Sequence, residues 1–199
     1  SDLVICSGAR FDDRSSGGVF DKFAPDANVI HIDIDPSTIN KNIKVDCPVV
    51  GDAKSVISQL DEAIPLNFQP DKEDRDNWFE RIKKWEETHP TVATQNPKAI
   101  KTSYTIDLLS KITKGKAVVV TDVGQHQMWV AQYYQFQNPR NQITSGGLGT
   151  MGFGFPAAIG AKLGRPNDTV LAVCGDGSFQ MNMQEFSTAV ANNLDLKIV

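Results

Sequence analysis

An uninterrupted apolar run at residues 169–174 ends abruptly at the tripeptide Gly175-Asp176-Gly177. A run without alternation predicts a strand buried on both faces of a parallel sheet, and the glycines stand where that strand would end. Ligands of open α/β sheets bind at the carboxyl ends of the strands. The glycines allow close approach of phosphate oxygens, and the carboxylate between them suits Mg²⁺. The tripeptide therefore predicts a metal-bound diphosphate site; the alternative is a plain turn in which Asp176 caps the next helix.

A second glycine-rich stretch lies just upstream, at residues 145–161. Its first half is too rich in glycine to form a regular element without a cost in stability. Its second half, residues 156–163, predicts a helix with a proline near the first turn. A glycine loop that leads into a helix presents unpaired N–H groups to an anion. The stretch therefore predicts a second anion-binding loop, with a flexible hinge as the alternative.

Polar side chains also follow the strand predicted at residues 116–121, in a loop that opens with Asp122. A lone histidine such as His126 more often has a structural role than a catalytic one. Here it is surrounded by Gly124, Gln125 and Gln127, which add hydrogen-bond donors to the same loop. Three strand-end loops with this chemistry in one α/β region predict one shared ligand.

The first sixty residues predict a separate α/β unit. Residues 2–7, 28–34 and 45–50 are strand-like, and the apolar positions between 53 and 64 have helical spacing. The charged loop after the first strand could be solvated, with ion pairs worth at most about 1 kcal/mol. Alternatively, Arg10 or Arg14 could clamp a phosphate through bonds of about 1.5 to 3 kcal/mol each. The unit lacks a Gly-x-Gly-x-x-Gly motif, which argues against a nicotinamide dehydrogenase.

Two prolines and a burst of charge at residues 65–74 predict a boundary between two domains, residues 1–68 and residues 69–199. After it, an aromatic stripe that begins at Trp78 marks one face of a helix and is interpreted as a packing face. The net charge of −4 gives no basic surface for nucleic acid. No apolar run approaches the length needed to span a membrane.

The three cysteines, Cys6, Cys47 and Cys174, have spacings unlike those of zinc sites or disulfide frameworks. Each stands in an apolar strand context. We therefore predict three buried free thiols in a reducing compartment.

Three stretches together resemble the diphosphate-binding domain of thiamine diphosphate-dependent enzymes: residues 123–129, 144–161 and 175–179. With Gly8-Ala-Arg-Phe-Asp-Asp-Arg14 they are similar in particular to the catalytic large subunits of acetohydroxyacid (acetolactate) synthases. The resemblance covers nearly the whole chain and is weakest across residues 65–103. It implies parallel-sheet α/β three-layer sandwich domains, namely the end of a Rossmann-like FAD-binding middle domain followed by the first part of a thiamine diphosphate-binding domain.

The resemblance also implies roles for individual residues. Asp176 would bind Mg²⁺, and Met151 would be the apolar wedge that bends thiamine diphosphate, with core packing as its alternative role. The other residues implied to contact thiamine diphosphate are Val123, Gly124, Gln125, His126, Gly149, Gly177 and Ser178. Those implied to contact FAD are Gly8, Ala9, Arg10, Asp13, Arg14, Asp33, Ile34, Asp52 and Ala53.

The implied reaction decarboxylates pyruvate on thiamine diphosphate and ligates the hydroxyethyl group to a second 2-oxo acid, pyruvate or 2-oxobutyrate, in branched-chain amino acid biosynthesis. The implied cofactors are thiamine diphosphate, Mg²⁺ and FAD. The implied assembly is a homodimer or homotetramer, with a small regulatory subunit as an optional partner. The implied location is the cytoplasm in a bacterium or archaeon, and a plastid or mitochondrion in a eukaryote. The alternatives are a pyruvate oxidase with the same cofactors, or a non-catalytic cofactor-binding fragment.

In this family an Asn-Asn pair after the Gly-Asp-Gly turn completes the Mg²⁺ shell, and we expect that pair to lie beyond Val199. The glutamate that activates the cofactor belongs to another domain, so no catalytic base is predicted in this chain, and these residues alone are expected to be inactive. Asn192-Asn193 is predicted instead to mark the end of a helix.

Overall fold

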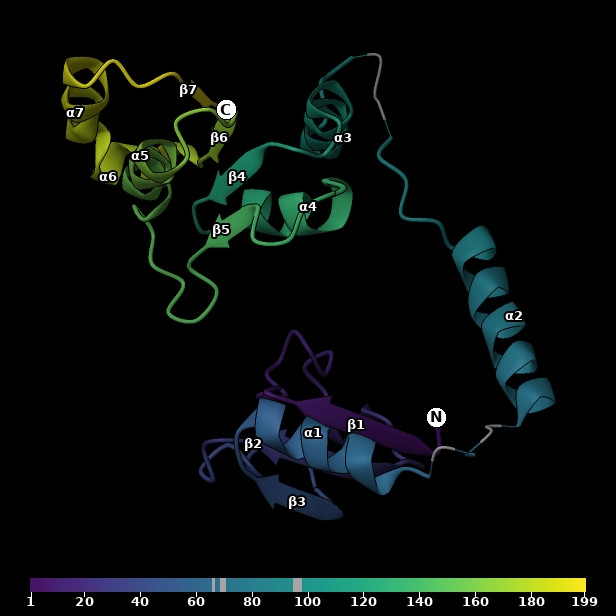
Figure 1. The fold of residues 1–199 in the computed structure, drawn as a ribbon. Helices are drawn as coiled ribbons and strands as arrows, with labels where there is room; N and C mark the ends of the chain where they lie inside the picture. Colours follow the sequence, from purple (N-terminus) through teal and green to yellow (C-terminus); the bar gives the residue numbers. More distant parts are fainter. Residues whose placement is uncertain (66, 69–70, 95–97) are drawn as a thin grey trace. The chain divides into compact units, whose positions relative to one another are not determined.

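The computed structural model describes residues 1–65, 67–68, 71–94 and 98–199. They form two units, Ser1–Asn77 and Trp78–Val199 (Figure 1). The predicted boundary segment falls partly on Leu66, Gln69 and Pro70, which lie outside the described residues. The domain bounds 1–68 and 69–199 stay a prediction.

The first unit is built on a three-stranded parallel sheet in the order β1-β2-β3, with α1 across one face (Figure 1). Its elements are β1 (Leu3–Ser7), β2 (Asn28–Asp33), β3 (Cys47–Val50) and α1 (Ala53–Ala63). The predicted strands and helix are thus confirmed, with small differences at their ends. The α1 helix begins where it does because the Asp52 carboxylate accepts the Ser55 N–H at 3.1 Å, a side-chain N-cap.

The segment between β1 and β2, which includes the short 3₁₀ turn η1 (Phe20–Lys22), contributes Phe11 to the core of this unit. Phe11 is buried with Val29 and Val45. Its ring meets the buried His31 ring edge-on, with 4.9 Å between centroids. Phe11 therefore anchors the charged loop that follows β1.

The α2 helix (Lys72–Thr88) carries the aromatic stripe, and its side chains pack on one another. The Trp78 and Trp85 rings meet edge-on at 5.8 Å, and the Arg81 guanidinium lies 4.9 Å from the Trp85 ring centre. Trp78, Phe79 and Trp85 all stay exposed. Within the described residues, the predicted packing is local to the helix.

The second unit is a three-layer α/β/α sandwich around a four-stranded parallel sheet in the order β5-β4-β6-β7. The strands are β4 (Val118–Thr121), β5 (Gln142–Thr144), β6 (Val170–Val173) and β7 (Leu196–Ile198). The helices are α3 (Thr102–Thr113), α4 (Gln125–Tyr133), α5 (Gly154–Gly164), α6 (Asp176–Met181), η2 (Met183–Glu185) and α7 (Phe186–Ala191).

Alternate residues of the central strands face the two helical layers. Val119 packs with Ile106 of α3 and Val130 of α4, whereas Val118 and Ala158 of α5 share the core of the opposite face. Every residue of β4 and β6 is buried. The continuous apolar runs predicted this double burial, and the α/β three-layer fold class is confirmed for this unit.

The structure differs from the sequence expectation at two places and agrees with it at a third. Gln125 and His126 were expected in a loop, but α4 already begins at Gln125. Cys47 is exposed, so the prediction of three buried thiols is wrong for it, whereas Cys6 and Cys174 are partly buried and all three are free. The predicted helix end at Asn192 is confirmed, since α7 ends at Ala191 and Asn193 has φ 51°. Among the described helices, none has the length and apolarity to cross a membrane.

Candidate functional site

Two of the predicted strand-end loops touch because β4 and β6 are paired, parallel neighbours whose carboxyl ends meet at Thr121 and Val173. The His126 ring lies against the turn after β6: a methyl group built on Gly175 would be 3.2 Å from its Cε1 atom. The Ser178 hydroxyl donates to the Val123 carbonyl at 3.5 Å. The residues predicted to line one diphosphate site are therefore in contact.

The glycine-rich loop joins the same place. The Met151 Cε atom lies 3.8 Å from the position that a methyl group on Gly177 would take. A methyl group on Gly149, whose φ is +66°, would be 3.9 Å from Val123 Cγ1. Met151 is 45% exposed, so core packing does not account for it. The structure thus brings all three predicted loops together.

Asp176 is exposed and is the first residue of α6. The N-cap of α6 is Gly175, with no side-chain cap bond, so the capping alternative for Asp176 is not what the structure shows. No group of three metal-ligating side chains occurs in the described ranges. A single carboxylate still suits Mg²⁺, which is usually held by one or two carboxylates together with phosphate oxygens and water.

Burial sets the protonation of two neighbouring groups. It lowers the pKa of His126, against the opposing effect of the Asp122 carboxylate, and the buried Nε2 atom has no hydrogen-bond partner among the described residues. Burial, with the negative charge of Asp122, raises the pKa of Cys174 to about 12. His126 is therefore neutral at pH 7, and Cys174 is a thiol rather than a nucleophilic thiolate.

Sequence reasoning assigned no role to Asp122, which the structure shows to be fully buried. Its carboxylate accepts the backbone N–H groups of Val123 at 2.7 Å, Gly152 at 3.0 Å and Gly154 at 2.7 Å. The only signal in the sequence is a charged residue directly after a buried strand. Its main partners lie thirty and thirty-two positions away, so local pattern could not identify them.

The carboxyl ends of the strands in the first unit surround a pocket of about 170 Å³. It is lined by Gly8, Ile32, Asp33, Ile34, Gly51, Asp52 and Ala53. Most of these residues were predicted to contact FAD, and they come from all three strand ends. The other four predicted residues, Ala9, Arg10, Asp13 and Arg14, follow in the loop after β1 and do not line this pocket.

The Arg10 and Arg14 side chains are exposed. Arg10 makes only a loose ion pair with Asp12, at 3.5 Å. The backbone beside them is held by a residue that sequence reasoning missed: the Asn42 amide donates to the carbonyls of Arg10 and Phe11, both at 3.0 Å. This loop therefore offers two accessible guanidinium groups on an anchored backbone.

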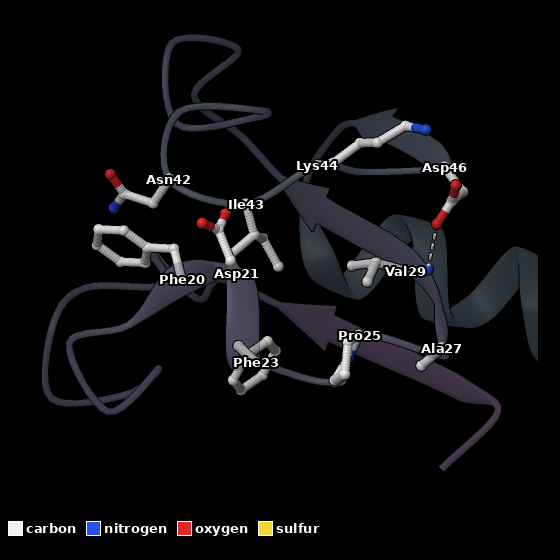
Figure 2. A pocket seen from close by; sticks show the side chains of 11 residues that line it. Phe20, Asp21, Phe23, Pro25, Ala27, Val29, Asn42, Ile43, Lys44 and Asp46 are labelled. Atoms are coloured by element: carbon white, nitrogen blue, oxygen red, sulfur yellow. Dashed lines mark hydrogen bonds between the residues drawn. The ribbon is translucent and has the colours of Figure 1, made fainter.

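A larger pocket, of about 280 Å³, lies at the amino ends of β2 and β3 (Figure 2). One of its two acidic residues, Asp46, accepts the Val29 N–H at 2.8 Å, the bond drawn dashed in Figure 2. Asn42 also lines the pocket, but its side-chain amide already donates a hydrogen bond to the Arg10 carbonyl in the loop after β1. The pocket lies away from the strand ends where the predicted nucleotide residues gather.

Comparison with known proteins identifies two matching family models. The central domain of thiamine pyrophosphate enzymes matches residues 1–60, and their C-terminal thiamine pyrophosphate-binding domain matches residues 122–199. Together they include both strand-end sites described above.

Curated relatives match the whole chain. The acetolactate synthase large subunit of Buchnera aphidicola subsp. Schlechtendalia chinensis is 47% identical over 200 residues, which is 35% of that protein. The acetolactate synthase isozyme 3 large subunit of Escherichia coli (strain K12) is 46% identical, again over 35% of its length. The acetolactate synthase of Mycobacterium leprae is 44% identical over 32% of its length. The chain thus spans about a third of the length of the curated relatives it matches.

Proposed function

Because this chain belongs to the thiamine pyrophosphate enzyme family, we propose that the whole protein containing it is the large subunit of an acetolactate synthase. Its substrates are pyruvate and a second 2-oxo acid, either pyruvate or 2-oxobutyrate. The observation that carries the proposal is that His126 and Met151 both meet the Gly175-Asp176-Gly177 turn at the carboxyl ends of β4 and β6, where His126 lies against Gly175 and Met151 against Gly177. This contact between the loops supports one diphosphate-bearing ligand that all three loops share, rather than three loops with unrelated roles.

Asp176 is the proposed Mg²⁺ ligand. Its carboxylate is exposed and has no partner among the described residues, which leaves it available for a cation. Diphosphate oxygens and water would fill the remaining positions of an octahedral shell. Gly177 and Ser178 follow directly, and Val123, Gly124, Gln125 and His126 approach from the other strand. A neutral His126 adds a hydrogen-bonding group without adding charge.

Met151 is proposed to shape the bound thiamine diphosphate, with Gly149 beside it. When bound, this cofactor would supply a cationic thiazolium ring, which takes up the electron pair released as a 2-oxo acid loses CO₂. The contribution of Met151 is an apolar, unbranched side chain that protrudes beside Gly177 and can exclude water.

FAD is proposed as the ligand of the first unit. The pocket lined by Gly8, Asp33 and Asp52 has room for part of a nucleotide. Arg10 and Arg14 in the adjoining loop carry the planar guanidinium groups that suit phosphate oxygens. A homodimer or homotetramer, an optional small regulatory subunit and a cytoplasmic location complete the proposal, and these rest on the family resemblance alone.

The direct test supplies the purified whole protein with pyruvate, Mg²⁺, thiamine diphosphate and FAD. We expect acetolactate, with no lasting change of the flavin absorbance under anaerobic conditions. Anaerobic bleaching of the flavin by pyruvate, without acetolactate, would identify a pyruvate oxidase instead. Neither product nor bleaching, in protein that is folded and loaded with cofactors, would contradict the proposed activity.

A further inference from the structure

Gly152 is held from two sides by side chains of other loops. On one side its N–H donates to the Asp122 carboxylate at 3.0 Å. On the other side its carbonyl accepts the Asn182 amide at 2.6 Å. Asp122 follows β4 and Asn182 follows α6. The two bonds therefore tie the glycine-rich loop to the segment after β4 and to the segment after α6.

The Asp122 contact is built into the backbone around it. A buried carboxylate is costly unless its oxygens are hydrogen-bonded, and here three N–H groups satisfy them. One donor is Gly154, the first residue of α5, where the positive end of the helix dipole adds to the attraction. A methyl group on Gly154 would lie 2.7 Å from the Asp122 nitrogen. Only a glycine permits this approach.

Gly152 itself has a backbone shape that side chains rarely adopt. Its φ is +84°, and a methyl group there would be 2.7 Å from the Asn182 amide nitrogen. The left-handed conformation turns the carbonyl toward Asn182 and the N–H toward Asp122. The backbone conformation of Gly152 therefore lets it bond to Asp122 and to Asn182 at the same time.

Met151 directly precedes this fixed glycine. A fixed backbone sets the direction of the Met151 Cα–Cβ bond and so limits the region that this otherwise flexible side chain can reach. Next to this fixed glycine, the Met151 side chain is partly exposed to solvent, and its Cε atom lies 3.8 Å from the position that a methyl group on Gly177 would take. Without the two bonds, the same loop would carry Met151 on a glycine-rich segment with many accessible conformations.

We propose that Asp122 and Asn182 are positioning residues that clamp Gly152 and thereby hold Met151 over the Gly175-Asp176-Gly177 turn. The clamp itself stands on the hydrogen bonds. Its purpose, to keep Met151 oriented toward thiamine diphosphate, rests on the proposed function.

Amide hydrogen exchange in the whole protein without cofactors tests the clamp. In Asp122→Asn, the amide NH₂ group would face a backbone N–H, so at least one bond is lost. We expect peptides spanning residues 145–155 to exchange about tenfold faster or more, because the lost bond was made to a buried charged group. Peptides from α3 should exchange at an unchanged rate.

Asp168→Asn is the matched control, because the Asp168 carboxylate pairs with Arg165 and not with the glycine-rich loop. It should leave the exchange of residues 145–155 unaffected.

Asn182→Ala removes the bond to the Gly152 carbonyl, together with an exposed bond that the Asn182 Oδ1 atom accepts from Gln184 at 3.3 Å. It provides the same measurement if Asp122→Asn does not fold. Unchanged exchange at residues 145–155 in a folded variant would overturn the clamp. An equal rise in the α3 peptides would also overturn it, because that result describes general loosening.

A double-variant comparison tests whether the clamp acts through Met151. Titration of thiamine diphosphate with Mg²⁺ should show weaker binding in Asp122→Asn and in Met151→Ala, with the double variant no weaker than Met151→Ala alone. If the double variant instead loses affinity by the product of the two single-variant losses, Asp122 does not act through Met151. If the unaltered protein does not bind thiamine diphosphate, the proposed function fails, while the exchange experiment still decides the clamp.

Discussion

His126 shows how one side chain couples the predicted site to stability. Its ring fills the space left by two glycines, since methyl groups on Gly124 and Gly175 would be 2.9 Å and 3.2 Å from Cε1. Burial at this contact lowers the pKa of the imidazole below its ordinary value. The same contact that joins the two loops therefore disfavours the protonated ring.

The sign of the pH effect follows from that shift. As pH falls below about 6.5, the unfolded chain takes up a proton at His126 before the folded chain does, so the free energy of unfolding decreases. We predict that His126→Gln reduces this loss between pH 7.5 and pH 5.5, as measured by urea unfolding followed through tryptophan fluorescence. His89→Gln alters an exposed histidine and should keep the original pH dependence. If the free energy of unfolding of His126→Gln depends on pH as steeply as that of the original protein, the pKa shift of His126 does not contribute to stability.

At the scale of elements, α5 offers a matched pair of glycines. A methyl group on Gly154 would collide with the Asp122 backbone nitrogen, whereas a methyl group on Gly160 would meet nothing within 4 Å. We predict that Gly154→Ala destabilises the protein by about 1 to 3 kcal/mol, as overpacking of a tight contact does. Gly160→Ala should stabilise it by up to about 1 kcal/mol through helix propensity. Thermal unfolding compares the two, and a Gly154→Ala protein as stable as the original would refute the tight contact.

The strands and the gathering of polar loops were predictable from sequence because both follow from local pattern. Continuous apolar runs identified β4 and β6 as doubly buried, and the residues after them were expected at one edge of the sheet. The start of α4 was missed because Gly124 and a polar first turn look like a loop. The exposure of Cys47 was missed because β3 is an edge strand, so strand-like residues there need not be buried.

The side-chain bonds that shape the site were not predictable. The partners of Asp122, Asn42 and Asn182 are about thirty positions away along the chain. Such pairs form only once the sheet has brought distant loops together. Local spacing therefore indicates which loops gather, but not which side chains hold them.

At the scale of the whole molecule, the two units carry separate strand-end sites of different character. The site in Trp78–Val199 offers one available carboxylate, Asp176, which suits a cation with its diphosphate. The site in Ser1–Asn77 offers exposed guanidinium groups at Arg10 and Arg14, which suit an anion directly. We therefore predict that metal dependence belongs to one cofactor alone.

This assignment gives Mg²⁺ and thiamine diphosphate to Asp176 in one unit, and FAD to the other. It is tested by titrating both cofactors, with and without Mg²⁺, into the whole protein carrying Asp176→Ala or Arg10→Ala. Asp176→Ala should lose Mg²⁺-dependent binding of thiamine diphosphate and keep FAD. Arg10→Ala should weaken FAD and keep thiamine diphosphate, with partial recovery in Arg10→Lys because an ammonium lacks the planar pair of donors. Unaltered Mg²⁺-dependent affinity for thiamine diphosphate in folded Asp176→Ala protein would contradict the account.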